Sequence, residues 1–440
     1  MKYLIVFIIV LVTSIGSVLP QPGRIENPNL NKRQSIFTQC VINPFGNNDS
    51  ITVHTFVRVA YRSLLFKKMK DQESYYSVLN FDLNCRNNDN IIKDRKTSTD
   101  TIWATSLNEI ELNNSYYIKN FSSILSNEKY ISNLEVMDEN KKVISSVKMP
   151  EIKADIFRQS SYSHSLIMAY GLGDKYYPMV LDSAFDFKVD NMYLFIPFRS
   201  DNSISQITYS IKCIEKNYER GFTYGELSVQ NGNAEVSNSS LNFINSEINI
   251  KNSDQDKLIK IKLNREIALP GKYEIRYKLP NSSEEIVSKF DIIYLNQPLS
   301  LAKQNTALLA MEYLMNEQEY SALKSADDEK FYEVLNQFWI KEDPTPETNY
   351  NEAMAEFFRR IDYSMVNYRD PQNPDGSRTA RGKIYALYGS PDKIDVKPES
   401  DKTIETWNYT KLKKSIIFEV SSGGFYKIVE ILQDGKSQNK

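Results

Sequence analysis

The residues best suited to chemistry gather in one stretch, Phe338–Ile394. Its acids of interest are Asp343, Glu352, Glu356 and Asp362, and its arginines are Arg359, Arg360 and Arg381. Glu352 and Glu356 share one face of an expected helix, and a like-charge pair can raise the pKa of one carboxyl enough for acid–base chemistry. The same acids can instead pair with the arginines and tie the helix to the next segment. We favour this structural interpretation, because structural ion pairs also perturb pKa values.

Arg381 and Gly382 are a second candidate, because the planar fork of arginine matches a carboxylate or a phosphate. The structural alternative is that Arg381 satisfies the acids of the helix while Gly382 allows a tight entry into a strand. Gly389 and Pro391 lie in a segment without the glycine spacing of a phosphate loop, so we interpret it as a turn. Trp339 and Trp407 could line a groove, although buried packing is the expectation for such aromatics.

Histidine and cysteine offer little further chemistry. His54 is expected on the exposed face of its strand, and His164 lies in a serine-rich segment without a nucleophile-elbow motif. No His/Cys pair has the spacing of a metal site, so we predict neither metal nor cofactor. Cys85 and Cys213 fall on apolar strand faces and are expected to be buried, while a Cys40–Cys85 disulfide remains an alternative.

Length and composition indicate several domains with a large share of β-structure. The chain has 440 residues, 41% hydrophobic, and its aromatics reach 12% through Tyr and Phe, which favour strands. The formal net charge is -2, and no basic helix stands out. We therefore do not expect a nucleic-acid partner.

The N-terminus predicts export. Lys2 precedes an apolar run over Tyr3–Val12, and small and polar residues follow it. The run is shorter than the ~20 residues that cross a bilayer, so we predict a cleaved signal peptide over residues 1–21 rather than a membrane anchor. No later stretch is apolar enough to span a membrane, and we expect the protein in the periplasm or at the cell surface.

Alternating patterns predict two β-sandwich-like, immunoglobulin-like domains, over residues 51–153 and 154–297, after a linker or edge segment at 22–50. The expected strands are Val53–Val59, Tyr76–Cys85, Asn191–Phe198 and two hairpins, Ile131–Val136 with Lys142–Val147 and Tyr273–Leu279 with Ser288–Tyr294. Residues 227–257 are rich in Asn and Ser, and we expect loops between short strands there.

Residues 298–432 predict an α+β domain of about three helices and an antiparallel sheet, before a polar tail at 433–440. Helical stripes run over Leu301–Met315, Phe331–Phe338 and Met354–Tyr368, with a capping box expected at Ser325–Asp328 and Pro344 ending the second helix. The expected strands are Lys383–Tyr388, Ile404–Tyr409, Ser415–Val420 and Phe425–Ile431.

Residues of about 300 to 431 resemble the GWxTD domain, a module of exported bacterial proteins. The resemblance rests on ordered motifs whose residues are Trp339, Asp343, Pro344, Asn351, Glu352, Arg360, Arg381, Gly382, Gly389, Pro391 and Trp407. The naming motif is degenerate, because Gly376 and Thr379 are present but Ser377 replaces the Trp and Ala380 the Asp. The resemblance implies preceding β domains and makes the motif residues structural or ligand-contacting, but it implies no particular activity.

Two hypotheses for function follow. The first is a non-catalytic binding or structural component of the bacterial cell envelope, whose partners are envelope proteins or an extracytoplasmic ligand. Such partners would dock on sheet edges or on an aromatic groove near Trp407. The alternative is an extracytoplasmic hydrolase that uses Glu352 or Asp343 with Arg381, and it requires these side chains to converge in a pocket.

Overall fold

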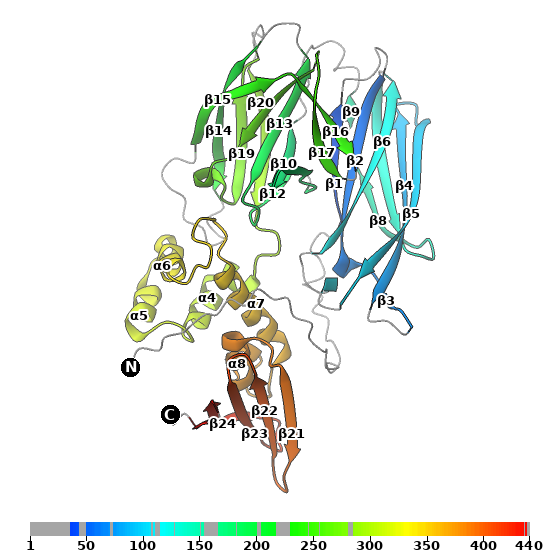
Figure 1. Ribbon diagram of the computed structural model, residues 1–440. Coiled ribbons are helices and arrows are strands. Elements are labelled where there is room, and N and C mark those ends of the chain that lie inside the picture. Colours follow the sequence, from blue (N-terminus) through cyan, green and yellow to red (C-terminus); the bar gives the residue numbers. More distant parts are fainter. Residues whose placement is uncertain are drawn as a thin grey trace. The chain divides into compact units, whose positions relative to one another are not determined.

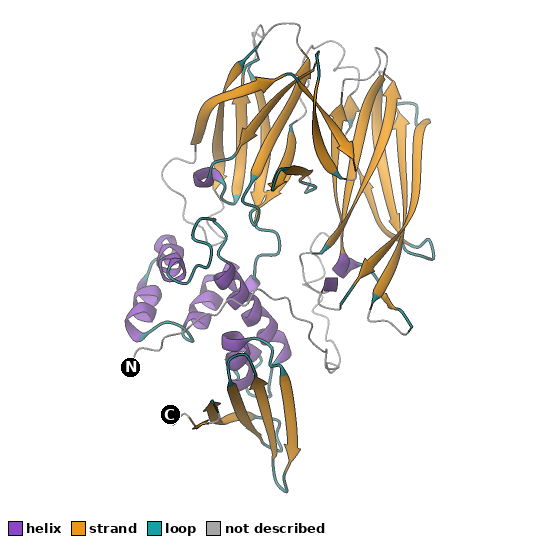
Figure 2. Ribbon diagram, in the orientation of Figure 1, coloured by secondary structure: helices purple, strands orange, loops and turns teal. Residues whose placement is uncertain are grey.

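The computed structural model describes residues 36–43, 50–70, 74–106, 109–110, 115–126, 128–149, 151–153, 166–181, 183–199, 204–216, 229–244, 246–254, 256–279, 285–434 and 436–437. These residues divide into two compact units. The first covers residues 26–216 and 224–295, and the second begins at residue 296. Strands dominate the first unit, and the second combines helices with a small sheet, as Figures 1 and 2 show.

Two sheets form the beginning of the first unit. One has the order β1-β2-β6 and is antiparallel, with β1 at Ile36–Asn43, β2 at Ser50–Ala60 and β6 at Tyr116–Ser126. The other has the order β3-β4-β7-β8, with β5 on β4 and β9 on β7. Its strands are β3 (Lys67–Lys68), β4 (Tyr75–Asn87), β5 (Ile92–Ala104), β7 (Lys129–Met137), β8 (Val143–Lys148) and β9 (Ile152–Lys153). The predicted strands at Val53–Val59 and Tyr76–Cys85 and the first hairpin are confirmed.

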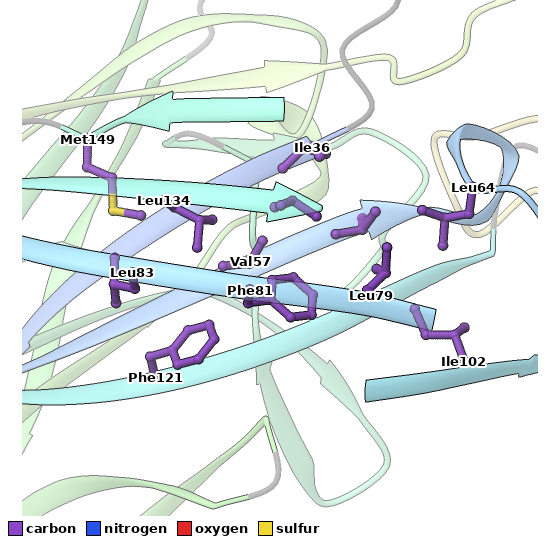
Figure 3. Close-up of a cluster of buried hydrophobic side chains, with 12 residues drawn as sticks. Ile36, Val57, Leu64, Leu79, Phe81, Leu83, Ile102, Phe121, Leu134 and Met149 are labelled. Carbon is purple, nitrogen blue, oxygen red and sulfur yellow. The ribbon is translucent and has the colours of Figure 1, made fainter. Parts of the chain in front are cut away.

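A hydrophobic cluster packs these two sheets against each other. Val57 of β2 and Phe121 of β6 meet Phe81 of β4 and Leu134 of β7, all of them buried, as Figure 3 shows. Each such side chain contributes roughly 1.5–3 kcal/mol by leaving water. The expected edge segment before residue 50 holds β1, whose one strand partner among the described residues is β2, and it contributes Ile36 to this cluster.

The rest of the first unit is one continuous ladder of strands, antiparallel except where β12 meets β20. Its order is β12 (Ala184–Asp186), β20 (Ile286–Ile293), β19 (Gly271–Tyr277), β14 (Gln206–Lys216), β15 (Val229–Ser237), β18 (Asp256–Lys262), β13 (Met192–Arg199), β10 (Ile167–Leu172), β11 (Lys175–Pro178), β17 (Glu247–Asn252) and β16 (Ser239–Ile244). The second predicted hairpin is confirmed as β19 and β20. Residues 227–257, where loops between short strands were expected, hold β15, β16 and β17, so strands take most of the segment.

A second hydrophobic cluster joins the β1-β2-β6 sheet to this ladder. It places Val41 and Phe56 beside Ile167, Phe195 and Phe243. Strand β2 is therefore covered on both faces, and His54 is buried rather than exposed as predicted, with 8% of its surface accessible. Its ring centroid lies 4.7 Å from that of Phe243, and its Nδ1 lies 2.9 Å from the Ser122 hydroxyl. Burial lowers the pKa of His54 to about 4.

The three cysteines are free thiols, so the alternative of a Cys40–Cys85 disulfide was wrong. Cys85 is buried on its strand as expected, whereas Cys213, also expected to be buried, is only half-buried. Burial raises the pKa of Cys40 to about 11. His164 and the predicted signal peptide lie outside the described residues. Within those residues no helix is both long enough and apolar enough to cross a membrane.

The second unit has more helices than the sequence predicted. Its helices are α3 (Leu299–Ala302), α4 (Gln304–Met311), α5 (Glu317–Ser325), α6 (Asp328–Ile340), α7 (Glu352–Asn367) and α8 (Ala380–Tyr388), with a 3-10 turn, η4, at Gly376–Arg378. The expected first helix is split between α3 and α4. Helix α6 takes Asp327 as its N-cap rather than Ser325, while α5 has its own capping box at Asn316 and Glu319. The stripes predicted over α6 and α7 are confirmed.

An antiparallel sheet of five strands closes the unit in sequence order. Its strands are β21 (Lys393–Pro398), β22 (Thr403–Tyr409), β23 (Lys414–Val420), β24 (Tyr426–Gln433) and β25 (Lys436–Ser437). Three of the four predicted strands are confirmed as β22, β23 and β24. The fourth, Lys383–Tyr388, was wrong, because Thr379 caps a helix there and Gly389 ends it in the left-handed region at φ 76°.

Burial of His54 predicts a pH-dependent stability of the first unit. The imidazole stays neutral in the folded chain down to about pH 4 but takes up a proton near pH 6.5 when unfolded. Stability is therefore complete above pH 6.5 and falls by about 3 kcal/mol as the pH drops to 4. We expect His54→Gln to remove this part of the pH slope in urea unfolding followed by circular dichroism. Equal slopes for the two proteins between pH 7 and pH 4 would contradict the prediction.

Candidate functional site

The N-terminal end of α7 is held by a side-chain amide. Asn351 accepts a hydrogen bond from the backbone N–H of Met354 at 2.8 Å and donates one to the carbonyl of Trp339, also at 2.8 Å. It is the N-cap of α7, and it joins that helix to the end of α6. Trp339 itself is buried, with its ring packed on Phe357 and Phe358, so it lines no groove.

Asp343 and Glu352 take part in the same end structure. An Asp343 carboxylate oxygen accepts the N–H of Thr345 at 2.9 Å, which folds the Asp-Pro-Thr-Pro segment into a turn. The Thr345 hydroxyl donates to the Glu352 carboxylate at 2.6 Å. Both acids therefore fix the loop that leads into α7. Pro344 lies in this loop, just after the end of α6, where it was predicted to end that helix.

Glu356 and Arg360 form the pair that their spacing predicted, with Nε of Arg360 donating to Glu356 at 2.9 Å. Arg359 also lies within 3.4 Å of Glu356. The Arg360 guanidinium packs against Gly389, whose missing Cβ would stand 3.2 Å from Cζ. Such a half-exposed pair contributes only a few tenths of a kcal/mol, so its main effect is to position the end of α8.

Asp362 serves as a cap for another helix. Its two carboxylate oxygens accept the N–H groups of Leu299 and Ser300 at 2.6 and 2.8 Å. Helix α3 has no capping side chain of its own, so a residue more than sixty positions later satisfies its first turn. The sequence did not reveal this role, because the two segments meet only in the folded unit.

The segment from Gly376 to Gly382 is a tightly packed helix start. The Thr379 hydroxyl donates to the Gly376 carbonyl at 2.8 Å and accepts the Gly382 N–H at 3.1 Å. A Cβ on Gly382 would stand 1.9 Å from the Gly376 oxygen, and one on Gly376 would stand 2.2 Å from the Ser364 carbonyl. Only glycine allows η4, α7 and α8 to approach this closely.

Arg381 follows this segment and does not pair with the acids of α7, so that expectation was wrong. Its guanidinium lies over the ring of Tyr426, 3.6 Å from the centroid, and 5.3 Å from that of Tyr368. Its Nε is buried and makes no hydrogen bond within the described part of the chain. The residue itself is partly exposed. We call Arg381 and the ring of Tyr426 the arginine shelf.

A buried aromatic layer supports the arginine shelf. Trp407 is buried, so it does not line the groove that the sequence suggested, and its indole N–H donates to Glu405 at 2.7 Å. The other oxygen of Glu405 lies 3.3 Å from the Tyr426 hydroxyl. Tyr368 packs on Trp407, and burial raises the pKa of Tyr368 and of Tyr426. Both phenols therefore stay neutral at physiological pH.

The residues of the hydrolase hypothesis do not meet. Arg381 lies beside Tyr368 at the C-terminal end of α7, and its neighbour Gly382 accepts from Ser364. Glu352 begins the same helix, sixteen residues before Tyr368, which is about 24 Å along its axis at 1.5 Å per residue. Asp343 lies with Glu352. The predicted residues therefore lie in two separate clusters, one with Asp343 and Glu352 and the other with Arg381. They do not form one pocket.

The described residues also hold a cavity of about 240 Å³ in the first unit. It lies between β4 and the β7–β8 hairpin, and its lining includes Tyr76, Leu79, Lys142 and Val143. None of the predicted site residues lines it. No group of three or more His, Cys, Asp or Glu residues stands ready for a metal ion in the described ranges.

Comparison with known families decides the identity of the second unit. Residues 281–425 match the family model described as GWxTD domain. The chain carries a GWxTD domain. Within it, Gly376 and Thr379 of the naming motif form the start of α8, while Ser377 and Ala380 stand at the altered positions.

Other comparisons add little to this domain. No curated protein matches the chain. Among solved structures, Salmonella alpha-2-macroglobulin reacted with methylamine matches at 11% identity and a TM-score of 0.14. The match covers 60% of this chain and 17% of that one, so the chain spans less than a fifth of the length of that protein. A likeness of this degree carries no argument about fold or function.

The close approach at Gly382 predicts a severe effect for a small substitution. We expect Gly382→Ala to destabilise the GWxTD domain by about 3 kcal/mol or more, because its Cβ meets the backbone carbonyl of Gly376 rather than a movable side chain. Urea unfolding followed by tryptophan fluorescence measures this, since Trp339 and Trp407 are both buried in the domain. The exposed Lys383→Ala on the same helix is the control and should change stability by less than about 0.5 kcal/mol. Similar midpoints for the two variants would refute the packing argument.

The Thr379 hydroxyl has two buried partners, so its removal has a separate cost. Thr379→Val keeps the shape but leaves the Gly382 N–H and the Gly376 carbonyl without this partner, and we expect a loss of about 1–2 kcal/mol. Thr379→Ser keeps the hydroxyl and should lose less than half as much. The same fluorescence-detected unfolding distinguishes them, and a larger loss in Thr379→Ser than in Thr379→Val would show that the methyl group, not the cap, matters.

Proposed function

We propose that this protein is an exported, non-catalytic binding or structural component of the bacterial cell envelope. In this proposal two immunoglobulin-like β-sandwich domains precede the GWxTD domain. The packed pair of sheets around Phe81 supports the first sandwich, and the ladder that ends in the β19–β20 hairpin supports the second. The apolar run after Lys2 supports export.

The proposal of a non-catalytic role rests on the contacts of the acidic residues in the family motifs. Asp343 and Glu352 fix a loop, Glu356 pairs with Arg360, and Asp362 caps α3. A catalytic pair needs an acid or base within hydrogen-bond reach of a common reacting atom. These carboxylates instead face different neighbours along the length of α7, as structural groups do.

The sheet of the GWxTD domain offers a surface for a partner strand. Strand β21 is at its edge, pairs only with β22 in the described residues, and has every side chain exposed. Val396 is 58% accessible and Ile394 37%. An edge of this kind can accept a further strand through main-chain hydrogen bonds, so we assign it to an extended segment of an envelope protein.

Cell fractionation and crosslinking test this proposal. The full chain, produced in a bacterial host, should leave the cytoplasm, appear in the periplasmic or membrane fraction, and crosslink to a discrete partner in intact cells. Retention in the cytoplasm, or recovery from the envelope as a monomer that crosslinks to nothing, would overturn it.

A lysine on the edge strand should block the partner. We expect Val396→Lys to reduce the crosslinked partner by roughly tenfold, because a charge at an edge disfavours strand addition. Stability should change by less than about 0.5 kcal/mol, as for other exposed positions. The matched control is Val429→Lys on β24, a similarly exposed apolar position at the opposite side of the same sheet, where β25 pairs only with Leu432 and Gln433 in the described residues. An equal reduction in both variants would contradict an interface at β21.

A further inference from the structure

We propose that the arginine shelf of the GWxTD domain binds a carboxylate group. The inference rests on the proposed function only in treating this domain as a binding module, and it names the chemistry of the ligand. The starting observation is a guanidinium that forms no ion pair or hydrogen bond within the described part of the chain, although four acids lie on or near the neighbouring helix.

The terminal nitrogens of Arg381 are the groups that a ligand can reach. Only its Nε is buried, the residue is partly exposed, and none of its nitrogens has a hydrogen-bond partner in the described part of the chain. Arg378 on the same segment shows the ordinary outcome, since it pairs with Glu312 at 2.9 Å and donates to the Leu309 carbonyl at 3.1 Å. Arg381 keeps its charge available instead.

The shelf is organised before any ligand arrives. The guanidinium stacks on Tyr426, whose hydroxyl contacts Glu405, and the Trp407 indole holds Glu405 from the buried side. A stacked arginine has already lost much of its rotamer freedom, so an acceptor in its plane gains two parallel hydrogen bonds at a low further cost in entropy.

The surrounding charges select the class of anion. The Arg381 guanidinium lies over the rings of Tyr368 and Tyr426, Glu405 contacts the Tyr426 hydroxyl, and both phenols remain neutral. One positive charge with a carboxylate nearby favours a planar monoanion over a phosphate dianion. The fork of Arg381 matches such a carboxylate bidentately.

Nitrogen-15 NMR of the arginine side chains tests the assignment on the full chain. Sodium acetate is the probe, with sodium chloride at equal ionic strength as reference. We expect the Arg381 Nη–Hη signals to move downfield and saturate with acetate, and the Arg378 signals to stay in place because that side chain is already paired. A shift no larger than that in chloride would overturn the proposal, and tighter binding of inorganic phosphate than of acetate would overturn the carboxylate class.

Two variants separate the fork from the charge. Arg381→Lys keeps the positive charge but loses the bidentate geometry, so acetate affinity, followed on the neighbouring Tyr426 ring signals, should fall roughly tenfold. Arg378→Lys is the matched control and should bind acetate as the parent does. Unchanged affinity in Arg381→Lys, with the circular dichroism spectrum of the parent, would overturn the site.

A further titration in the same experiment tests whether the carboxylate comes from a peptide or from a small acid. A short peptide with one Asp and an amidated end is compared with a peptide that has only its C-terminal carboxylate and with acetate itself. Each uses the same Arg381 signal, and a peptide that binds no better than acetate assigns the site to small acids. The outcome is independent of the envelope crosslinking, because it uses purified protein, so either result can fail without the other.

Discussion

The GWxTD domain depends on one backbone contact, the approach of Gly382 to the carbonyl of Gly376. No other residue type leaves room for this contact, since a Cβ would stand 1.9 Å from that oxygen. It brings the start of α8 against the C-terminal half of α7, where Ser364 reaches the Gly382 carbonyl. The aromatic layer of Tyr368 and Trp407 and the stacked Arg381 take their places from this arrangement.

Local patterns predicted elements where apolar residues repeat strongly within one segment. The alternation over Val53–Val59 and the stripe over Met354–Tyr368 became β2 and α7. The segment at Lys383–Tyr388 was wrongly predicted as a strand. Its residues Ile384, Tyr385 and Tyr388 favour strands, and a glycine and a proline flank them. The deciding signal was Thr379 three residues before Gly382, a cap that satisfies the first turn of α8 and outweighs intrinsic preference.

Roles that need a distant partner could not be predicted from local sequence. His54 was assigned to the exposed face, but the cluster around Phe243 covers that face of β2. Arg381 was assigned to nearby acids, but its neighbour in the fold is Tyr426, forty-five positions later. Asp362 likewise caps α3 across the unit. In each case the deciding contact joins residues that are far apart in the sequence, and local patterns do not contain this information.

The degenerate naming motif has a physical explanation in this chain. Gly376 and Thr379 are the positions where backbone approach and the helix cap require a given residue type. At position 377 the backbone carbonyl accepts the Tyr313 hydroxyl at 2.7 Å, and the Ser377 hydroxyl donates to the Asp375 carboxylate at 2.7 Å, so a serine fits there. Ala380 begins α8 with its backbone already organised by Thr379. The motif thus serves to position the helix start, and the chemistry that the domain offers to a ligand lies one residue beyond it, at Arg381.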